Sequence, residues 1–261
     1  MKRKNFTLLE LLIVVAVIAI LAGLLLPVLN SARNTALSIS CTGRLKMIGA
    51  AQAMYSSDWN DWIVPALTDS TEGQSQTWAF KLGTGGIGNI SRTPYGIRYY
   101  KIKNDSNGQI ADDFRCPSDP RPISWAPGYV NPFLISHFAS NLYLGGSSNA
   151  DYHKTSAVTS GSIAIFAADS SLKGAGSLFH YDNFSFRHGI GDSRANAMTT
   201  GPDATEIPFA KSMTNIVYID GHASSKNVFG LFQDSADAVM CVGGGAANPN
   251  SKKSLLAGFK Y

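Results

Sequence analysis

The chain has 261 residues, of which 44% are apolar and 15% are charged. This length is ample for a membrane segment and a folded unit with its own core, and the composition excludes disorder over the whole chain. The net charge is +4, but Lys2, Arg3 and Lys4 supply three of these positive charges. No basic stripe follows them, so we expect no nucleic-acid partner.

The segment from Phe6 to Leu29 is almost wholly apolar. As a helix, its 24 residues would rise about 36 Å, enough to cross a hydrocarbon core of roughly 30 Å. The three cations precede it, so the positive-inside rule predicts a cytoplasmic N-terminus and an extracytoplasmic remainder. A cleaved secretory signal is an alternative, but its apolar region spans only about 7–15 residues. A plain signal anchor fits the length but does not explain Glu10, because a carboxylate within a membrane span requires a partner.

Helical periodicity continues beyond the apolar segment. One face carries Cys41, Leu45, Ile48, Gln52 and Tyr55, at steps of three and four residues, and Ala51 and Met54 widen this stripe. Pro27 removes a backbone donor, which predicts a kink in the helix. We therefore predict one long helix from Phe6 to Ser57, with residues 6–29 in lipid or a filament core. Residues 30–57 would lie against a globular domain.

The later part of the chain contains short strand-like runs separated by turns. The candidates are Asn141–Leu144, Ser162–Ala168, Phe184–Phe186, Asn215–Ile219 and His222–Val228. Asp220-Gly221 between the last two runs predicts a hairpin. One long helix followed by antiparallel strands predicts an α+β fold with long loops.

The sequence KRKNFTLLE at residues 2–10, followed by the apolar run, resembles the N-terminal cleavage and methylation segment of type IV prepilins and type II secretion pseudopilins. The resemblance implies a pilin-like fold, cleavage by prepilin peptidase between Asn5 and Phe6, and methylation of the new N-terminus. It also implies that Glu10 pairs with the terminal amine of a neighbouring subunit. The family usually has Gly where this chain has Asn5.

The same resemblance divides the chain into four parts. Residues 1–5 would be a cytoplasmic leader peptide, and residues 6–29 the transmembrane and assembly half of the helix. Residues 30–57 would be its periplasmic half, and residues 58–261 an extracytoplasmic, β-rich globular domain.

Five later motifs follow one another in order: the helix around Cys41, the sequence FRCPSD at 114–119, Asp169-Ser170, Arg187-His188-Gly189 and Ile219-Asp220-Gly221-His222. This series resembles a large pseudopilin-like family of planctomycete- and Lentisphaera-type bacteria, whose C-terminal part carries a His-spacer-Asp-Gly signature. About ten residues separate the two halves of that signature in the family. Here residues 191–212 lie between them, which predicts an inserted loop.

Three cysteines on the outer side of a membrane suggest a disulfide. Cys41 on the helix and Cys116 at the proline-rich turn both lie in family-like motifs and are the candidate pair, with two buried thiols as the alternative. Cys241 would then be the odd thiol. The chain has no CxxC pair, which argues against a structural zinc site.

Two imidazoles and two carboxylates form a second candidate site. They are an acceptable ligand set for zinc or another divalent metal, and each follows a predicted strand: Asp169, His188, Asp220 and His222. The alternative is a structural polar cluster. No GxSxG or HExxH motif occurs, so we expect no enzyme and no cofactor other than such a metal.

These sequence features are consistent with two alternative functions. The first is a structural subunit of a type II secretion pseudopilus or type IV-like filament. Its partners would be prepilin peptidase, like or related subunits and the inner membrane, which the chain would cross once with a periplasmic or extracellular C-terminal domain. The second is a membrane-tethered extracytoplasmic module that binds a glycan or a metal and is exported through the prepilin-type segment. Its glycan-stacking candidates are Trp59, Trp62, Trp78 and Trp125.

Overall fold

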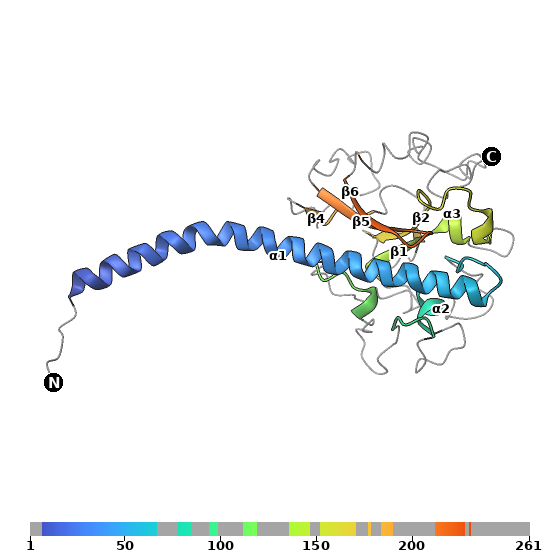
Figure 1. Cartoon of the computed structure of the whole chain (residues 1–261), viewed down its shortest axis with the longest axis horizontal. Coiled ribbons are helices and arrows are strands. Elements are labelled where there is room, and N and C mark those ends of the chain that lie inside the picture. Colours follow the sequence, from blue (N-terminus) through green and yellow to red (C-terminus); the bar gives the residue numbers. More distant parts are fainter. Residues whose placement is uncertain are drawn as a thin grey trace, which may run out of the picture.

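The computed structural model describes residues 7–66, 78–84, 94–98, 112–118, 136–146, 152–170, 177–178, 184–189, 212–227 and 230. Its helices are α1 (Leu8–Asp58), α2 (Trp78–Thr84) and α3 (Leu142–Gly145), with short 3-10 helices at Asp112–Phe114 and Thr155–Ala157. Its strands are β1 (Phe138–Asn141), β2 (Ile165–Asp169), β3 (Ser177–Leu178), β4 (His188–Gly189), β5 (Ser212–Tyr218) and β6 (Ala223–Asn227) (Figure 1). Asn5, Phe6, Trp125, Cys241 and all but the last residue of the 191–212 insert lie outside the described residues.

The long helix α1 confirms the predicted element, but it begins two residues later than predicted, at Leu8, and ends one residue later, at Asp58. Thr7 caps its N-terminus. Asn60 and Asp61 follow with φ values of 48° and 66°, a left-handed conformation that stops the helix and that Asn and Asp tolerate better than most residues. The helix continues through Pro27, and Figure 1 shows α1 bowed rather than broken.

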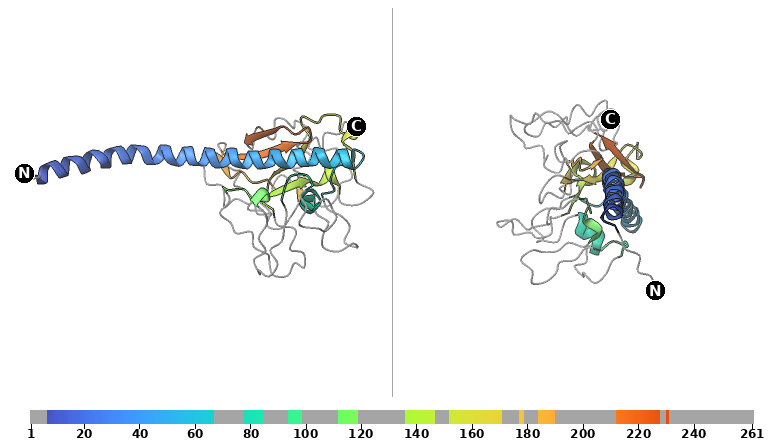
Figure 2. Two further views of the ribbon diagram at one scale, coloured as in Figure 1. Left: turned by 60° about the horizontal axis from the view of Figure 1, so that its bottom comes forward. Right: turned by 90° about the vertical axis from the view of Figure 1, so that its left-hand side faces the viewer.

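The second half of α1 packs on the sheet through one stripe of side chains. All five predicted stripe residues are buried, and so is Ala51, whereas Met54 is 44% exposed and turns away from the core. Gly49 brings the helix close to β5, since a Cβ there would lie only 2.7 Å from Val217 Cγ2. Figure 2 shows the first half of α1 extending past the sheet as a lone helix.

The sheet is built around β5. Strand order is β3-β1-β2-β5-β4, with β6 also paired to β5. Met213 pairs with His188 of β4 and with Asn227 of β6, so β4 and β6 lie on opposite edges of β5. Strand β2 pairs with the other end of β5, at Ile216–Tyr218. All of these pairings are antiparallel except that of β1 with β3.

The alternation of side chains along the strands gives the sheet two buried faces. Ala167 and Val217 face α1 and join its stripe in the main core, which also includes Trp78, Phe114 and Phe166. Ala168, Ile216 and Phe186 belong to a second cluster. A long helix on a mostly antiparallel sheet gives the α+β, pilin-like layout that was predicted.

Two strand predictions were wrong in detail. The run Asn141–Leu144 is not a strand, because the Asn141 side chain accepts a hydrogen bond from Tyr143 N–H at 3.0 Å and starts α3. Strand β1 ends at Asn141, and the rest of the run is helical. Phe184 and Phe186 are both buried, as their alternation predicted, but Phe184 forms only an isolated bridge with Ser170. The hairpin at Asp220-Gly221 is confirmed, and Gly221 has a φ of 89° that favours glycine.

Candidate functional site

The first half of α1 is an apolar surface without a covering. Every described residue from Thr7 to Ala36 is exposed, including Leu8, Ile18 and Leu24 at 88%, 59% and 68%. The helix contains an 18-residue window with a mean hydropathy of 3.1, and is long and apolar enough to cross a membrane. Water strongly disfavours so large a continuous apolar surface, so this half is suited to a lipid environment or to packing against other helices.

Glu10 lies at the exposed start of this apolar surface. Its Oε2 accepts hydrogen bonds from the Thr7 backbone N–H and from the Thr7 hydroxyl, both at 2.8 Å. Thr7 Oγ1 in turn accepts from the Glu10 N–H at 3.3 Å, which completes a capping box. The carboxylate is therefore held at the positive end of the helix dipole, next to the predicted cleavage point.

A second, buried site lies in the core under α1. The ligand atoms of Cys41, Cys116, Asp169 and His188 all lie within 4.8 Å of one another. Cys116 Sγ is 3.5 Å from His188 Nε2, and the same nitrogen is 3.1 Å from Asp169 Oδ2. The Cys41 thiol donates to Asp169 Oδ1 at 3.4 Å. None of the four residues is more than 2% exposed.

Strand register brings Asp169 and His188 together. Ala168 pairs with Ile216 and His188 pairs with Met213, so the end of β2 and the start of β4 meet along one edge of β5. Asn215, between these two points, donates its backbone N–H to Asp169 Oδ2 at 2.9 Å. Asp169 lies two positions after Ala167, and so on the face that α1 covers.

The two cysteines reach the cluster from α1 and from the 112–118 segment. Cys41 is the first residue of the buried stripe of α1. Cys116 is fixed by its own backbone N–H, which donates to His137 Nδ1 at 2.9 Å. Arg44, one turn after Cys41, donates from Nη1 to the carbonyl of Arg115 and ties the segment to the helix.

Burial and charge act against each other in this cluster. Burial opposes ionisation of Asp169, but His188 and the nearby Arg187 hold the pKa of its carboxyl below the usual value. Burial alone would lower the pKa of His188, yet the Asp169 carboxylate outweighs it and raises that pKa to about 9. Asp169 and His188 are therefore an ion pair at neutral pH.

The two thiols differ in character. Burial disfavours the thiolate of Cys116, but the Cys41 thiol and the His188 ring beside it lower the pKa of Cys116 to about 6. Burial raises the pKa of Cys41 well above that of a free thiol. The surroundings therefore favour ionisation of Cys116 over ionisation of Cys41.

The predicted metal set does not converge as a group of four. Asp220 and His222 form a separate pair at the β5–β6 turn, with His222 Nδ1 2.6 Å from Asp220 Oδ1 and both side chains at least 40% exposed. The ring of Tyr218 stacks on His222, and Tyr218 pairs with Ile165 at the start of β2. Asp169 is the last residue of the same strand. The two pairs therefore lie at opposite ends of the sheet, because an extended strand separates them.

The sequence did indicate each member of the buried cluster, but not the grouping. Cys41, Cys116, Asp169 and His188 each lie in one of the ordered motifs. Their joint proximity depends on the register of β2, β4 and β5 and on the docking of α1, which no spacing pattern encodes. Cys41 and Cys116 are free thiols in the structure, and the predicted disulfide stays a prediction.

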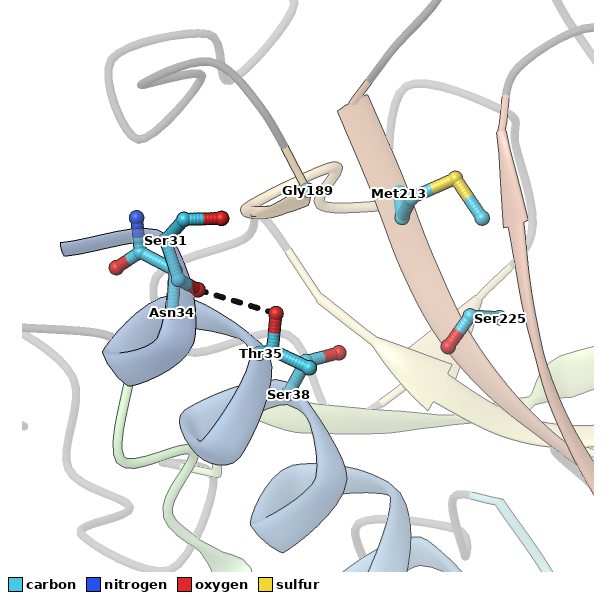
Figure 3. A pocket seen from close by; sticks show the side chains of 7 residues that line it. All are labelled: Ser31, Asn34, Thr35, Ser38, Gly189, Met213 and Ser225. Carbon is cyan, nitrogen blue, oxygen red and sulfur yellow. Dashed lines mark hydrogen bonds between the residues drawn. The ribbon is translucent and has the colours of Figure 1, made fainter. Parts of the chain in front are cut away.

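A hollow of about 570 Å³ opens where α1 leaves the sheet (Figure 3). Figure 3 shows helix side chains on one side and strand residues on the other, with the Thr35 hydroxyl donating to the Ser31 carbonyl at 3.0 Å. Its lining offers hydroxyl, amide and thioether groups but no carboxylate, imidazole or thiol: Ser31, Asn34, Thr35, Ser38, Gly189, Met213 and Ser225. As far as the described residues line it, this hollow therefore lacks the groups of an acid–base site.

The tryptophans do not form a free stacking face among the described residues. Trp78 is fully buried in the main core. Trp59 is 48% exposed but stacks on Tyr55 and donates its indole N–H to the Tyr95 hydroxyl at 3.2 Å. The Trp62 ring lies under the Lys154 ammonium, 5.2 Å from the ring centroid. These contacts give Trp59 and Trp62 structural roles within the chain.

A bare apolar helix continuous with a helix that packs on a sheet gives the described residues an α+β, pilin-like layout with one candidate membrane span. Comparison with known proteins agrees. The family described as "Prokaryotic N-terminal methylation motif" matches residues 2–26. The chain is 48% identical over 59 residues to the type IV wide pilus major component PilA4 of Thermus thermophilus, a match that covers 23% of this chain and 45% of that protein. No solved structure matches the chain.

The N-terminal part of the chain is therefore similar to that of type IV prepilins. It spans less than half the length of the curated relative that it matches. The His-spacer-Asp-Gly resemblance of its later motifs stays a prediction.

Proposed function

We propose that this protein is a pilin-like structural subunit that prepilin peptidase processes and that assembles through α1 into a type IV-like filament or a secretion pseudopilus. The observation that carries this proposal is the division of α1 into two halves. Residues 7–36 are all exposed and mostly apolar, whereas the second half is anchored in the core from Cys41 onward. A helix of this kind can lie in a membrane before assembly and pack against copies of itself afterwards, because lipid and neighbouring helices cover the same apolar surface.

Cleavage between Asn5 and Phe6 would place a new charged amine directly before the helix. Thr7 would then be the second residue of the mature chain, and the capping box would hold Glu10 at the helix start. In an assembly, Glu10 of one subunit would accept the terminal amine of its neighbour. An ion pair in an apolar environment offsets the cost of burying each charge separately, which makes Glu10 a determinant of register between subunits.

The mature N-terminus tests the processing step. We expect mass spectrometry of protein from cells with an active prepilin peptidase to find a chain that begins at methylated Phe6. Asn5→Gly, which restores the residue usual in the family, should raise the processed fraction. An intact Met1 in both proteins would show that the segment serves only as an anchor.

Substitution of Glu10 tests assembly. Glu10→Gln should leave membrane insertion intact but abolish filament formation, as measured by shearing and electron microscopy. Thr7→Val is the matched control, since it removes the hydroxyl of the capping box but keeps the carboxylate, and its filaments should persist. If Glu10→Gln assembles as well as the unmodified chain, the pairing role is wrong.

A further inference from the structure

The buried cluster under α1 has the composition and geometry of a metal site. We propose that Cys41, Cys116, Asp169 and His188 bind one Zn²⁺ ion in a closed, tetrahedral site. The set supplies two sulfurs, one nitrogen and one oxygen, all ligand types that zinc takes in proteins. No open position would remain for water, which is the pattern of a structural site rather than a catalytic one.

The distances between the ligand atoms fit this geometry. The usual zinc bond lengths place neighbouring ligands of a tetrahedral site roughly 3.4–3.8 Å apart. Cys116 Sγ lies 3.5 Å from His188 Nε2, and that nitrogen lies 3.1 Å from Asp169 Oδ2. Cys41 Sγ lies 3.4 Å from the other carboxylate oxygen, Oδ1. Because the four ligand atoms all lie within 4.8 Å of one another, shifts of up to about 1 Å would seat the ion.

The surrounding hydrogen bonds orient the ligands for a metal. His188 directs Nε2 into the cluster, while its Nδ1 lies 3.3 Å from the Ser118 hydroxyl, which can accept the Nδ1 proton. The backbone N–H of Asn215 fixes Asp169. Metal-binding side chains usually have outer partners of this kind, which set the tautomer and the orientation of each ligand.

The charges also balance. Two thiolates and one carboxylate around Zn²⁺ leave one net negative charge. Arg187 is buried next to the cluster and acts electrostatically on Cys41, Cys116 and Asp169. Its guanidinium would compensate the remaining charge, so the loaded site would be neutral in the core.

Geometry argues against a Cys–His–Asp nucleophile at the same place. In such a triad the carboxylate binds the imidazole nitrogen opposite the one that faces the nucleophile. Here Cys116 and Asp169 both approach Nε2 of His188. Cys116 is also only 1% exposed, so no substrate could reach it.

Zinc content of the full-length chain tests the proposal. The protein would be purified in detergent without chelator, and its zinc measured by plasma mass spectrometry. We expect about one zinc per chain. After chelation and reduction, Co²⁺ should bind with the visible absorption of a tetrahedral site and with thiolate charge transfer. Zinc below about a tenth per chain without a cobalt–thiolate band, or a Cys41–Cys116 disulfide in unreduced peptides, would overturn the proposal.

Variants locate the ion. Cys41→Ser and His188→Gln should each weaken Co²⁺ binding at least tenfold. His222→Gln is the matched control, since it removes an imidazole from the exposed Asp220 pair, and Cys241→Ser removes the third cysteine; neither should change binding. Ser118→Ala, which leaves the four ligands and the core intact, should weaken binding about tenfold through the orientation of His188. Equal binding by His188→Gln and His222→Gln would contradict the assignment.

Discussion

His188 Nε2 lies 3.1 Å from Asp169 Oδ2, and the two side chains are 1% and 0% exposed. The contact joins the end of β2 to the start of β4 beneath α1. A buried ion pair depends on both partners, because loss of one leaves the other charge in the core without compensation. The pair is therefore a sensitive point of the fold as well as part of the proposed zinc site.

Asp169→Asn and His188→Gln should each lower the free energy of unfolding by about 3–5 kcal/mol. The measurement is denaturant unfolding of the chelator-treated chain in detergent. Asp220→Asn and His222→Gln are the matched controls, since they break an exposed pair of the same chemistry, and should stay within about 0.5 kcal/mol of the unmodified chain. Equal effects at the buried and the exposed pair would show that burial does not control how much each pair contributes to the free energy of unfolding.

The two glycines of the docked half of α1 should respond in opposite directions to Ala. At Gly43 an added methyl would meet open space, so Gly43→Ala should stabilise the chain by about 0.5–1 kcal/mol through helix propensity. At Gly49 the added methyl would meet Val217 Cγ2 at 2.7 Å, and Gly49→Ala should destabilise by about 1–3 kcal/mol. Thermal unfolding of both variants checks this. Stabilisation by both would mean that α1 docks less closely on β5.

The ion pair between Arg98 and Asp113 should stabilise the fold by an amount that decreases at acid pH. Burial opposes ionisation of Asp113, but Arg98 donates from its backbone N–H, Nε and Nη2 and holds the pKa of that carboxyl below its usual value. A lowered folded-state pKa stabilises the protein above the unfolded pKa of about 3.9, and this stabilisation is lost as the pH falls through the folded value.

Asp113→Asn should therefore destabilise the chain by about 1 kcal/mol or less at pH 6, because Arg98 is partly exposed. The difference from the unmodified chain should shrink as the pH falls through the folded-state pKa of Asp113, because both chains then carry a neutral side chain at this position. Thermal unfolding from pH 2 to 7 measures it. A constant difference at all pH values would indicate packing rather than charge.

Arg187 connects three segments around the cluster. Its Nε donates to Ser185 Oγ at 2.9 Å, and its Nη2 donates to the carbonyls of His137 and Ser170. Arg187→Lys cannot reproduce this fork, so it should destabilise the chain by about 1–3 kcal/mol in denaturant unfolding. Arg33→Lys, on the exposed half of α1, should be neutral. Tolerance of Arg187→Lys would show that one charge, without the fork, is sufficient.

Local patterns predicted the elements better than their grouping. The stripe from Cys41 to Tyr55 predicted the buried face of α1, because helical periodicity is a property of neighbouring residues. The same reasoning failed at Asn141, where one side-chain hydrogen bond turned an expected strand into a helix start. The sequence patterns also predicted one metal-binding set of Asp169, His188, Asp220 and His222. The structure separates these residues into two pairs.

Residue patterns alone predict the apolar helix, the carboxylate of Glu10 near its start and the α+β order of elements. These features depend on composition and periodicity, both of which are local. The meeting of four side chains in one buried cluster becomes visible only in the folded chain: Cys41, Cys116, Asp169 and His188. Their contact arises from strand register and from the close approach of α1 at Gly49, which are set by packing between distant segments.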